Sequence, residues 1–324
     1  MIILKKIPYG YTDYKELILD NCFYIDKTMY LEKLESLSNK KVVYLKPRRF
    51  GKTLFTSMMG YYYDINSENE FDSLFKDTYI YNHPTKNKNN YYVLKLDFSG
   101  MDINVNDIES INNVFKSVLY EGINDFLGKY NIEYLVDKSL TASSLLGDFL
   151  IYIKSLKLEH KLYLIIDEYD NFTNSILGNN LELFKGILGD SGFVKAFYAT
   201  IKESCGTIID RVFITGVCSI SLDAMTSGFN IATKITTDEM FNSMTALTHE
   251  EVKDLIHKVD SKNEEKIYSE MVDNYDGYKF NAKCETVFNP TLTMYYLDNF
   301  QRFRHYQIQD RHKDVFYNTI LFFH

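Results

Sequence analysis

Residues 42–53 read VVYLKPRRFGKT, an apolar run followed by a basic loop and the tripeptide Gly51-Lys52-Thr53. Helical periodicity begins at Lys52, so the pattern predicts a strand, a loop and a helix in that order. Backbone N–H groups at such a helix start point at an anion, and the Lys and Thr that follow can bind phosphate and magnesium. The stretch therefore predicts a phosphate-binding loop in which Lys52 holds phosphate and Thr53 holds Mg²⁺.

The loop departs from the usual pattern G-x-x-x-x-G-K-[ST] at its first position, where Lys46 stands in place of glycine, and Pro47 lacks a backbone donor. Plain capping and solvation of a helix start explain a lone Gly-Lys-Thr equally well. We assign the whole segment to nucleotide binding, and its residues are Lys46, Pro47, Arg48, Arg49, Phe50, Gly51, Lys52, Thr53 and Leu54. Of the two arginines, one could neutralise nucleotide charge and the other reach a neighbouring element or subunit, unless both are simply solvated.

A second motif, residues 162–170, reads LYLIIDEYD and has the form of a Walker B strand, an apolar strand that ends in two carboxylates. In phosphoryl-transfer sites the first acid holds magnesium or its water, and the second orients the attacking water. We assign these roles to Asp167 and Glu168. An ordinary buried strand that emerges into a polar turn is the alternative, but the two motifs in this order favour the functional interpretation.

Strand and helix patterns alternate along the first two thirds of the chain. Strands are expected at Val42–Leu45, Tyr92–Phe98, Leu162–Ile166 and Val212–Thr215, and helices at Lys52–Tyr63, Asp107–Lys129, Thr141–Leu158 and Gly192–Glu203. This alternation predicts parallel strands with crossover helices and a ligand at the carboxyl ends of the strands. After Gly216 it fades, and helices near Glu250–Val259 and Glu264–Tyr275 predict a smaller helical lobe. We expect a core at residues 1–222 and a lobe at 223–324.

Four further residues or segments invite an assignment. Thr215, at the end of the fourth strand, is a candidate sensor of the terminal phosphate, or else a buried Thr bonded to backbone. Arg211 begins the same strand at the opposite edge of the sheet, so we expect a structural role. The segment Asp26–Thr28 either packs near the base of a nucleotide or caps a helix. Lys279 either meets a phosphate or is solvated.

The composition indicates a globular protein without broad affinity for polyanions. The net charge is −8 and the pI about 5.5, which argues against charge-driven binding to nucleic acid or anionic membrane. The four cysteines are far apart and the histidines scattered, so neither a disulfide framework nor a zinc site is supported. Without a signal peptide or a long apolar run, the sequence predicts a cytoplasmic protein.

The sequence resembles the AAA-ATPase-like family of prokaryotic and viral proteins, which is often joined to a C-terminal PD-(D/E)xK nuclease domain. The resemblance is carried by Ile7–Gly10, Phe23–Thr28, Lys46–Leu54, Asp167–Phe172, Arg211–Val217, Thr226–Ile231 and Tyr275–Phe280. The form Pro-Arg-Arg-Phe-Gly-Lys-Thr is typical of that family. The resemblance implies an α/β P-loop NTPase with an additional-strand, mostly parallel sheet between helices, and ATP and Mg²⁺ as cofactors. A homo-oligomer, a nucleic acid or a nuclease domain as partner is suggested by the resemblance alone.

These observations favour a magnesium-dependent ATPase with Glu168, Lys52 and Thr215 as catalytic residues. One alternative is a nucleotide switch that binds ATP without hydrolysing it. Another is the regulatory ATPase half of a nuclease-linked defence or mobile-element protein. No Asp followed by Glu-x-Lys in a strand context occurs near the C-terminus, and the apolar end Phe316–His324 suggests an interrupted element. We therefore expect no DNA cleavage by this chain.

Overall fold

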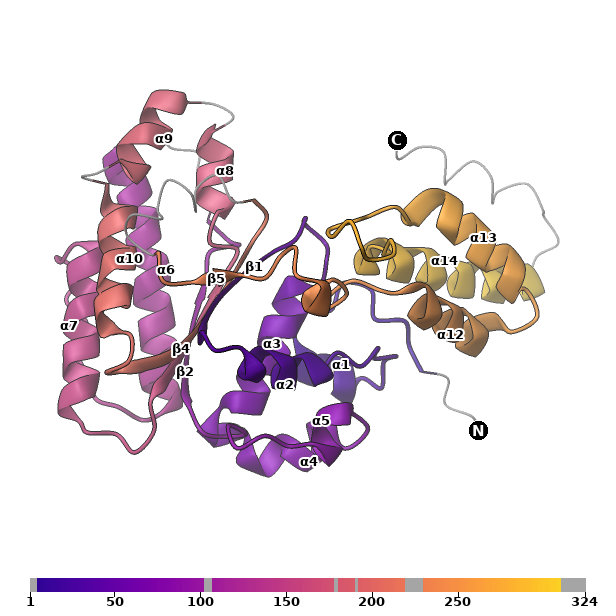
Figure 1. Cartoon of the computed structure of the whole chain (residues 1–324), viewed down its shortest axis with the longest axis horizontal. Helices are drawn as coiled ribbons and strands as arrows, with labels where there is room; N and C mark the ends of the chain where they lie inside the picture. Colours follow the sequence, from indigo (N-terminus) through magenta and orange to yellow (C-terminus); the bar gives the residue numbers. More distant parts are fainter. Residues whose placement is uncertain (1–4, 102–106, 178–179, 190–191, 219–229, 310–324) are drawn as a thin grey trace.

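The computed structural model describes residues 5–101, 107–177, 180–189, 192–218 and 230–309. An α/β body holds the sheet, and a smaller lobe of three helices, α12 to α14, lies to one side of it (Figure 1). The predicted boundary at 222/223, residues 226–229 of the resemblance and the end Phe316–His324 lie outside the described residues. In the described part of the chain, no helix has the length and apolar character needed to cross a membrane.

The sheet has five strands, and every strand pair in it is parallel. The strands are β1 (Lys41–Leu45), β2 (Tyr92–Asp97), β3 (Leu162–Asp167), β4 (Ile209–Gly216) and β5 (Thr233–Lys234). Their order is β2-β3-β4-β1-β5, so β4 lies between the strand before the loop and the strand of the second motif. The four expected strands are confirmed, whereas β5 is too short to leave a pattern in the sequence.

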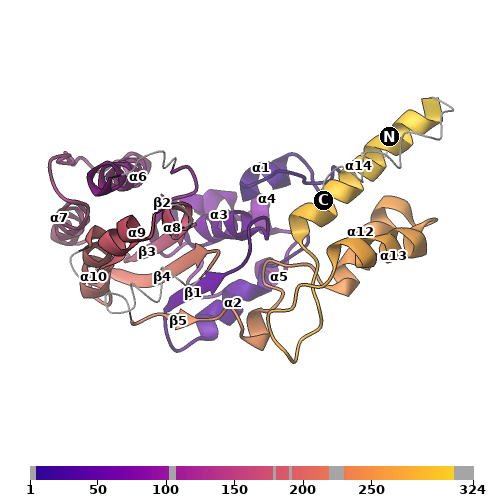
Figure 2. The same ribbon diagram turned by 90° about the horizontal axis from the view of Figure 1, so that it is seen from above.

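Both faces of the sheet are covered by helices, which explains why its strands are continuous apolar runs. Along β3 every residue is buried, and Leu164 belongs to one core cluster while Ile165 belongs to the other. The first face carries α6 (Ile108–Lys129), α7 (Ala142–Ser155), α8 (Asn171–Leu177), α9 (Leu181–Leu188) and α10 (Phe193–Ser204) (Figure 2). The second carries α1 (Tyr14–Leu19), α2 (Met29–Ser36), α3 (Lys52–Tyr63), η1 (Ile65–Glu70), α4 (Phe71–Phe75) and α5 (Tyr79–Asn82).

The lobe has an apolar core, which Ile7 of the N-terminal segment also joins, and it follows the connector, residues 235–248, which contains η2 (Glu239–Phe241). Its helices are α12 (His249–Asp260), α13 (Glu264–Tyr275) and α14 (Pro290–Gln309). A capping box formed by Thr248 and Glu251 starts α12, and the two expected helices of this region are confirmed. The sequence analysis missed α14, although a proline at the first position of a helix is a known start signal.

Candidate functional site

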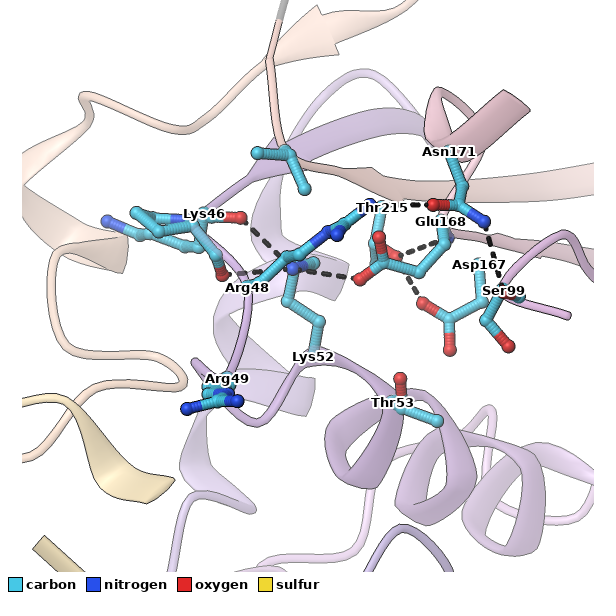
Figure 3. A network of polar contacts seen from close by, with 12 residues as sticks. Lys46, Arg48, Arg49, Lys52, Thr53, Ser99, Asp167, Glu168, Asn171 and Thr215 are labelled. Carbon is cyan, nitrogen blue, oxygen red and sulfur yellow. Dashed lines mark hydrogen bonds and ion pairs between the residues drawn. The ribbon is translucent and has the colours of Figure 1, made fainter. Parts of the chain in front are cut away.

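The predicted site residues meet at the carboxyl ends of β1, β3 and β4, as the alternation of strands and helices predicts (Figure 3). The register pairs Leu45 with Gly216 and Asp97 with Asp167, so the ends of the strands lie side by side. The loop after β1 therefore lies next to the two acids that end β3.

The loop enters α3 through two residues with positive φ. Gly51 has φ 72° and is the N-cap of α3, and Arg49 has φ 68°. Glycine adopts this conformation without a steric penalty, which explains its place before Lys52. At the other end of the loop, the Lys46 amide donates to the Gly216 carbonyl at 3.0 Å. The loop is thus fixed to the end of β4 before it turns into the helix.

The Lys52 ammonium is bound inside the loop. Nζ donates to the carbonyl oxygens of Lys46 at 3.0 Å and Pro47 at 3.1 Å, and it lies 3.0 Å from Glu168 Oε1. Because the side chain is only 2% exposed, each of these partners replaces water around a buried charge. Phosphate oxygens could replace all three partners.

Two threonine hydroxyls hold the Asp167 carboxylate, which is fully buried. Thr215 Oγ1 donates to Oδ1, and Thr56 Oγ1 lies 3.0 Å from Oδ2 and 2.9 Å from the Thr53 carbonyl. The half-buried Thr53 lies in the first turn of α3, one turn before Thr56, and its hydroxyl faces the same space (Figure 3). Thr53 and Asp167, the predicted magnesium ligands, are therefore neighbours.

Glu168 takes a backbone conformation that is uncommon outside glycine, with φ 52°. Its amide donates to Thr215 Oγ1 at 3.3 Å, which turns the side chain toward Lys52. Thr215, the predicted phosphate sensor, is 1% exposed and bonds to both adjacent acids. In this structure it positions Asp167 and Glu168, so its role as a sensor stays a prediction.

The two loop arginines lie apart. Arg48 is exposed, and its NH2 donates to Asn171 Oδ1 at 2.9 Å. Asn171 Nδ2 in turn donates to the carbonyl oxygens of Phe98 and Ser99 after β2. Arg48 therefore lies over the carboxyl ends of β2 and β3, whereas Arg49 points away from Lys52 (Figure 3).

The side chain of Lys46 points away from the two acids, so only its backbone belongs to the loop interior (Figure 3). It is 1% exposed, and Nζ lies 3.3 Å from the centroid of the Phe280 ring. Burial lowers the pKa of Lys46 to about 7, and the Cys284 thiol nearby raises it slightly against that trend.

A cavity of about 350 Å³ opens beside the loop. Its polar side is formed by Arg49, Gly51, Lys52, Thr53 and Glu168. The remaining wall comes from the N-terminal segment and the lobe, and includes Pro8, Phe23, Tyr24, Ile25, Leu247 and Met294. A largely apolar wall with a few polar groups at one end is typical of a small-molecule site.

The segment Asp26–Thr28 joins the body to the lobe. Lys27 lines the cavity, and its ammonium lies 2.6 Å from Glu251 of α12. Asp26 accepts from the amides of Thr28 and Tyr79. Burial lowers the pKa of Lys27, although the pairing with Glu251 opposes that shift. The segment is thus a structural link that also reaches the cavity.

Sequence reasoning missed Thr56, Asn171 and Asp170. Asp170 is fully buried and accepts from the amides of Val217 and Cys218, which fixes the chain after β4. Its place two residues after the acid pair was an available signal, whereas Thr56 carries none, because a Thr inside a helix has no distinctive pattern. In the described residues, no group of three His, Cys, Asp or Glu could hold a metal by itself. Bound Mg²⁺ would thus need phosphate oxygens and water beside Thr53 and Asp167.

Comparison with known proteins identifies the family of the chain. A family model described as AAA-ATPase-like, predicted AAA-ATPase, matches residues 8–226, which is more than half of the chain. The matched range includes the loop, both acids of β3 and Thr215. A search of curated proteins found no match. The chain therefore belongs to the AAA-ATPase-like family of predicted AAA-ATPases.

Proposed function

We propose that this chain is a P-loop ATPase that binds ATP with Mg²⁺ and hydrolyses it. The observation that carries the proposal is the meeting of Lys52, Thr53, Asp167 and Glu168 at one buried edge of a parallel sheet. Membership of a predicted ATPase family and the strand β4 between β1 and β3 support it. The all-parallel sheet flanked by helices is compatible with a P-loop-like fold.

Each residue has a role that follows from its surroundings. The phosphates would take the place of the loop carbonyls and of Glu168 around Lys52, and the amides at the start of α3 would hold their oxygens. Thr53 and Asp167 would hold Mg²⁺, which neutralises charge as it develops in phosphoryl transfer. Released from Lys52, Glu168 would accept a hydrogen bond from the attacking water. Arg48, an exposed cation of the loop, lies on the same side of the loop as these acids.

The cavity would take the nucleoside. It begins at the loop and is lined beyond it by apolar and aromatic side chains such as Phe23, Tyr24 and Met294. A base is planar and poorly hydrated on its faces, so it suits such a wall. The size, about 350 Å³, falls within the range of small-molecule pockets.

Substitution Glu168→Gln tests hydrolysis. The amide keeps the size of the side chain but removes the charge that orients water, so we expect turnover to fall by about 10²-fold or more. Binding of Mg-ATP should be retained or tightened, because Lys52 loses an ionic partner that competes with phosphate. Phosphate release and equilibrium binding of a fluorescent ATP analogue measure the two effects. Glu159→Gln, an exposed site at the opposite edge of the sheet, is the control.

A nucleotide switch without turnover is the second candidate. The ion pair between Lys52 and Glu168 favours it, because the carboxylate that would orient the water is held by Lys52. Equal and near-background phosphate release by the wild-type protein and Glu168→Gln, with nucleotide binding intact, would establish the switch and exclude hydrolysis.

Partners and location stay predictions. Self-association, a nucleic acid and a linked nuclease domain come from the family resemblance, and a cytoplasmic location comes from the sequence alone. Turnover measured with and without DNA or RNA, over a range of protein concentrations, tests the first two. Incubation of purified protein with DNA and Mg²⁺ should leave the DNA uncut.

A further inference from the structure

Lys46, which replaces the usual first glycine of the loop, extends its side chain into the part of the chain that follows β5. Nζ lies over the Phe280 ring and donates at 3.4 Å to the carbonyl oxygens of Thr236 and Asn242. In the described part of the chain, no carboxylate forms an ion pair with it. The partners of this buried ammonium therefore come from the connector and from residues 276–288, the loop between α13 and α14.

The backbone of the same residue faces the phosphate site. Its carbonyl accepts from Lys52 Nζ at 3.0 Å, and its amide donates to the Gly216 carbonyl. One residue thus contacts the lobe through its side chain and the predicted phosphate-binding lysine through its backbone. A glycine at this position would keep the second contact and lose the first.

The lobe also holds the other end of the loop. Phe50 is fully buried and packs edge-to-face against Tyr278 and Phe280, with ring centroids 4.8 and 5.4 Å away. The Arg49 carbonyl accepts from the Thr291 hydroxyl at 2.7 Å, at the start of α14. The loop therefore has little freedom to change its shape while residues 276–291 stay in place.

We propose that Lys46 is a positioning residue that couples occupancy of the phosphate loop to the position of the 276–288 loop of the lobe. The inference rests on the proposed function. When phosphate draws Lys52 away, the Lys46 carbonyl loses its partner and the loop backbone readjusts. A buried side chain fixed on Phe280 transmits that adjustment to the lobe. Thermodynamic linkage makes the coupling reciprocal, so the position of the lobe sets nucleotide affinity by the same factor.

Hydrogen exchange of residues 276–288, with and without a non-hydrolysable ATP analogue and Mg²⁺, tests the coupling. At pH 6.5 we expect the analogue to slow exchange there by about tenfold in the wild-type protein. Lys46→Met and Phe280→Leu keep apolar bulk but remove the cation or the ring, so each should reduce the effect to below about twofold and weaken analogue binding by about tenfold. Lys283→Met, at an exposed lysine of the same loop, should behave as wild type.

The double variant shows whether the two single variants lose the same interaction or two independent ones. Because both substitutions break the contact between the Lys46 ammonium and the Phe280 ring, the loss of analogue binding in the double variant should be smaller than the sum of the two single losses. Wild-type protection in the single variants, additive losses, or no protection of 276–288 in a wild-type protein that binds the analogue would each overturn the inference. If Lys46→Met does not fold, Phe280→Leu tests the same contact from the lobe. Absence of any binding by the wild-type protein would instead contradict the proposed function.

Discussion

The two edges of the sheet each carry a lysine paired with an acid, in very different surroundings. At the carboxyl edge, Lys52 and Glu168 are 3.0 Å apart and their side chains are 2% and 14% exposed. At the amino edge, Lys40 and Asp210 are 2.8 Å apart and 45% and 17% exposed. The two separations are nearly the same, so burial and the remaining partners must distinguish the pair that we propose to be functional from the structural pair.

The remaining partners differ in kind. Lys52 donates to backbone carbonyls of a loop that faces a cavity and opens a helix. Asp210 accepts from the Tyr91 hydroxyl, and the same hydroxyl accepts from Arg211 Nε. The polar side chains at the amino edge are thus hydrogen-bonded to one another, which agrees with the structural role expected for Arg211. A cavity of about 520 Å³ opens there too, but in the described residues its lining includes no helix start.

The largest expected effect is the loss of stability that a methyl group added at the carboxyl edge of the sheet would cause. A Cβ on Gly216 would lie 2.3 Å from a carbon of the Tyr169 ring and 2.6 Å from Asp170 Oδ1. Both neighbours are buried, so Gly216→Ala should lower the free energy of unfolding by about 3 kcal/mol. Denaturant unfolding measures the change, and activity should fall with it because Thr215 precedes this residue.

Gly206 at the amino edge is the matched control. A Cβ there meets nothing within 4 Å, and the cost comes only from its φ of +85°. We expect Gly206→Ala to cost about 1 kcal/mol and to leave nucleotide binding unchanged. Equal destabilisation by both substitutions would show that the carboxyl edge is no more tightly packed than the amino edge.

Replacement of each paired lysine tests the comparison directly. Any ligand that binds only the native state stabilises it, by about 2.7 kcal/mol at a hundredfold excess over Kd. Mg-ATP should raise the thermal midpoint of the wild-type protein and of Lys40→Ala, whereas Lys52→Ala should lose most of that shift. Without ligand, Lys40→Ala should cost under about 1 kcal/mol, because its pair is half exposed. A full ligand shift in Lys52→Ala would contradict the phosphate-loop assignment.

The strands, the helix and the acids at the carboxyl edge could be predicted from the sequence, whereas the contacts between distant side chains could not. Four strands and the helix from Lys52 to Tyr63 were predicted because buried parallel strands and amphipathic helices have strong periods. The acids of β3 could be placed because a strand that ends in charge is conspicuous. The contact of Thr56 with Asp167 spans 111 residues of chain and depends on how α3 lies on β3, which no local pattern encodes.

The position of the Lys46 side chain is a second feature that could not be predicted from the sequence. Its position in the motif predicted a role at the phosphates, whereas its side chain lies against Phe280, 234 residues later in the chain. Neither the length of the connector nor its polarity shows that the lobe packs against the loop. The departure from glycine could be recognised from the sequence, but its cause depends on tertiary structure.

The last expected effect is a pH dependence that only the buried Lys46 should cause. The native pKa of Lys46 is about 7, below the ordinary lysine value of 10.5, so between these values the unfolded chain binds a proton that the native protein does not. The free energy of unfolding must then rise with pH. From pH 7.0 to 8.5 the contribution is about 2 kcal/mol, and the range stays below the titration of tyrosines.

Lys46→Met should remove that rise, and Lys40→Met should keep it, because the Lys40 amine stays half in water. Urea unfolding of the three proteins at pH 7.0, 7.5, 8.0 and 8.5 measures the slope, and the difference between wild type and Lys46→Met isolates Lys46 from all other titrating groups. If this difference in the free energy of unfolding does not change with pH over this range, the native amine keeps its proton. The ammonium over Phe280 would then be better solvated or better paired than its 1% exposure implies. A difference that rises by about 2 kcal/mol would show that the lobe keeps Lys46 buried at a cost in stability below pH 8.5.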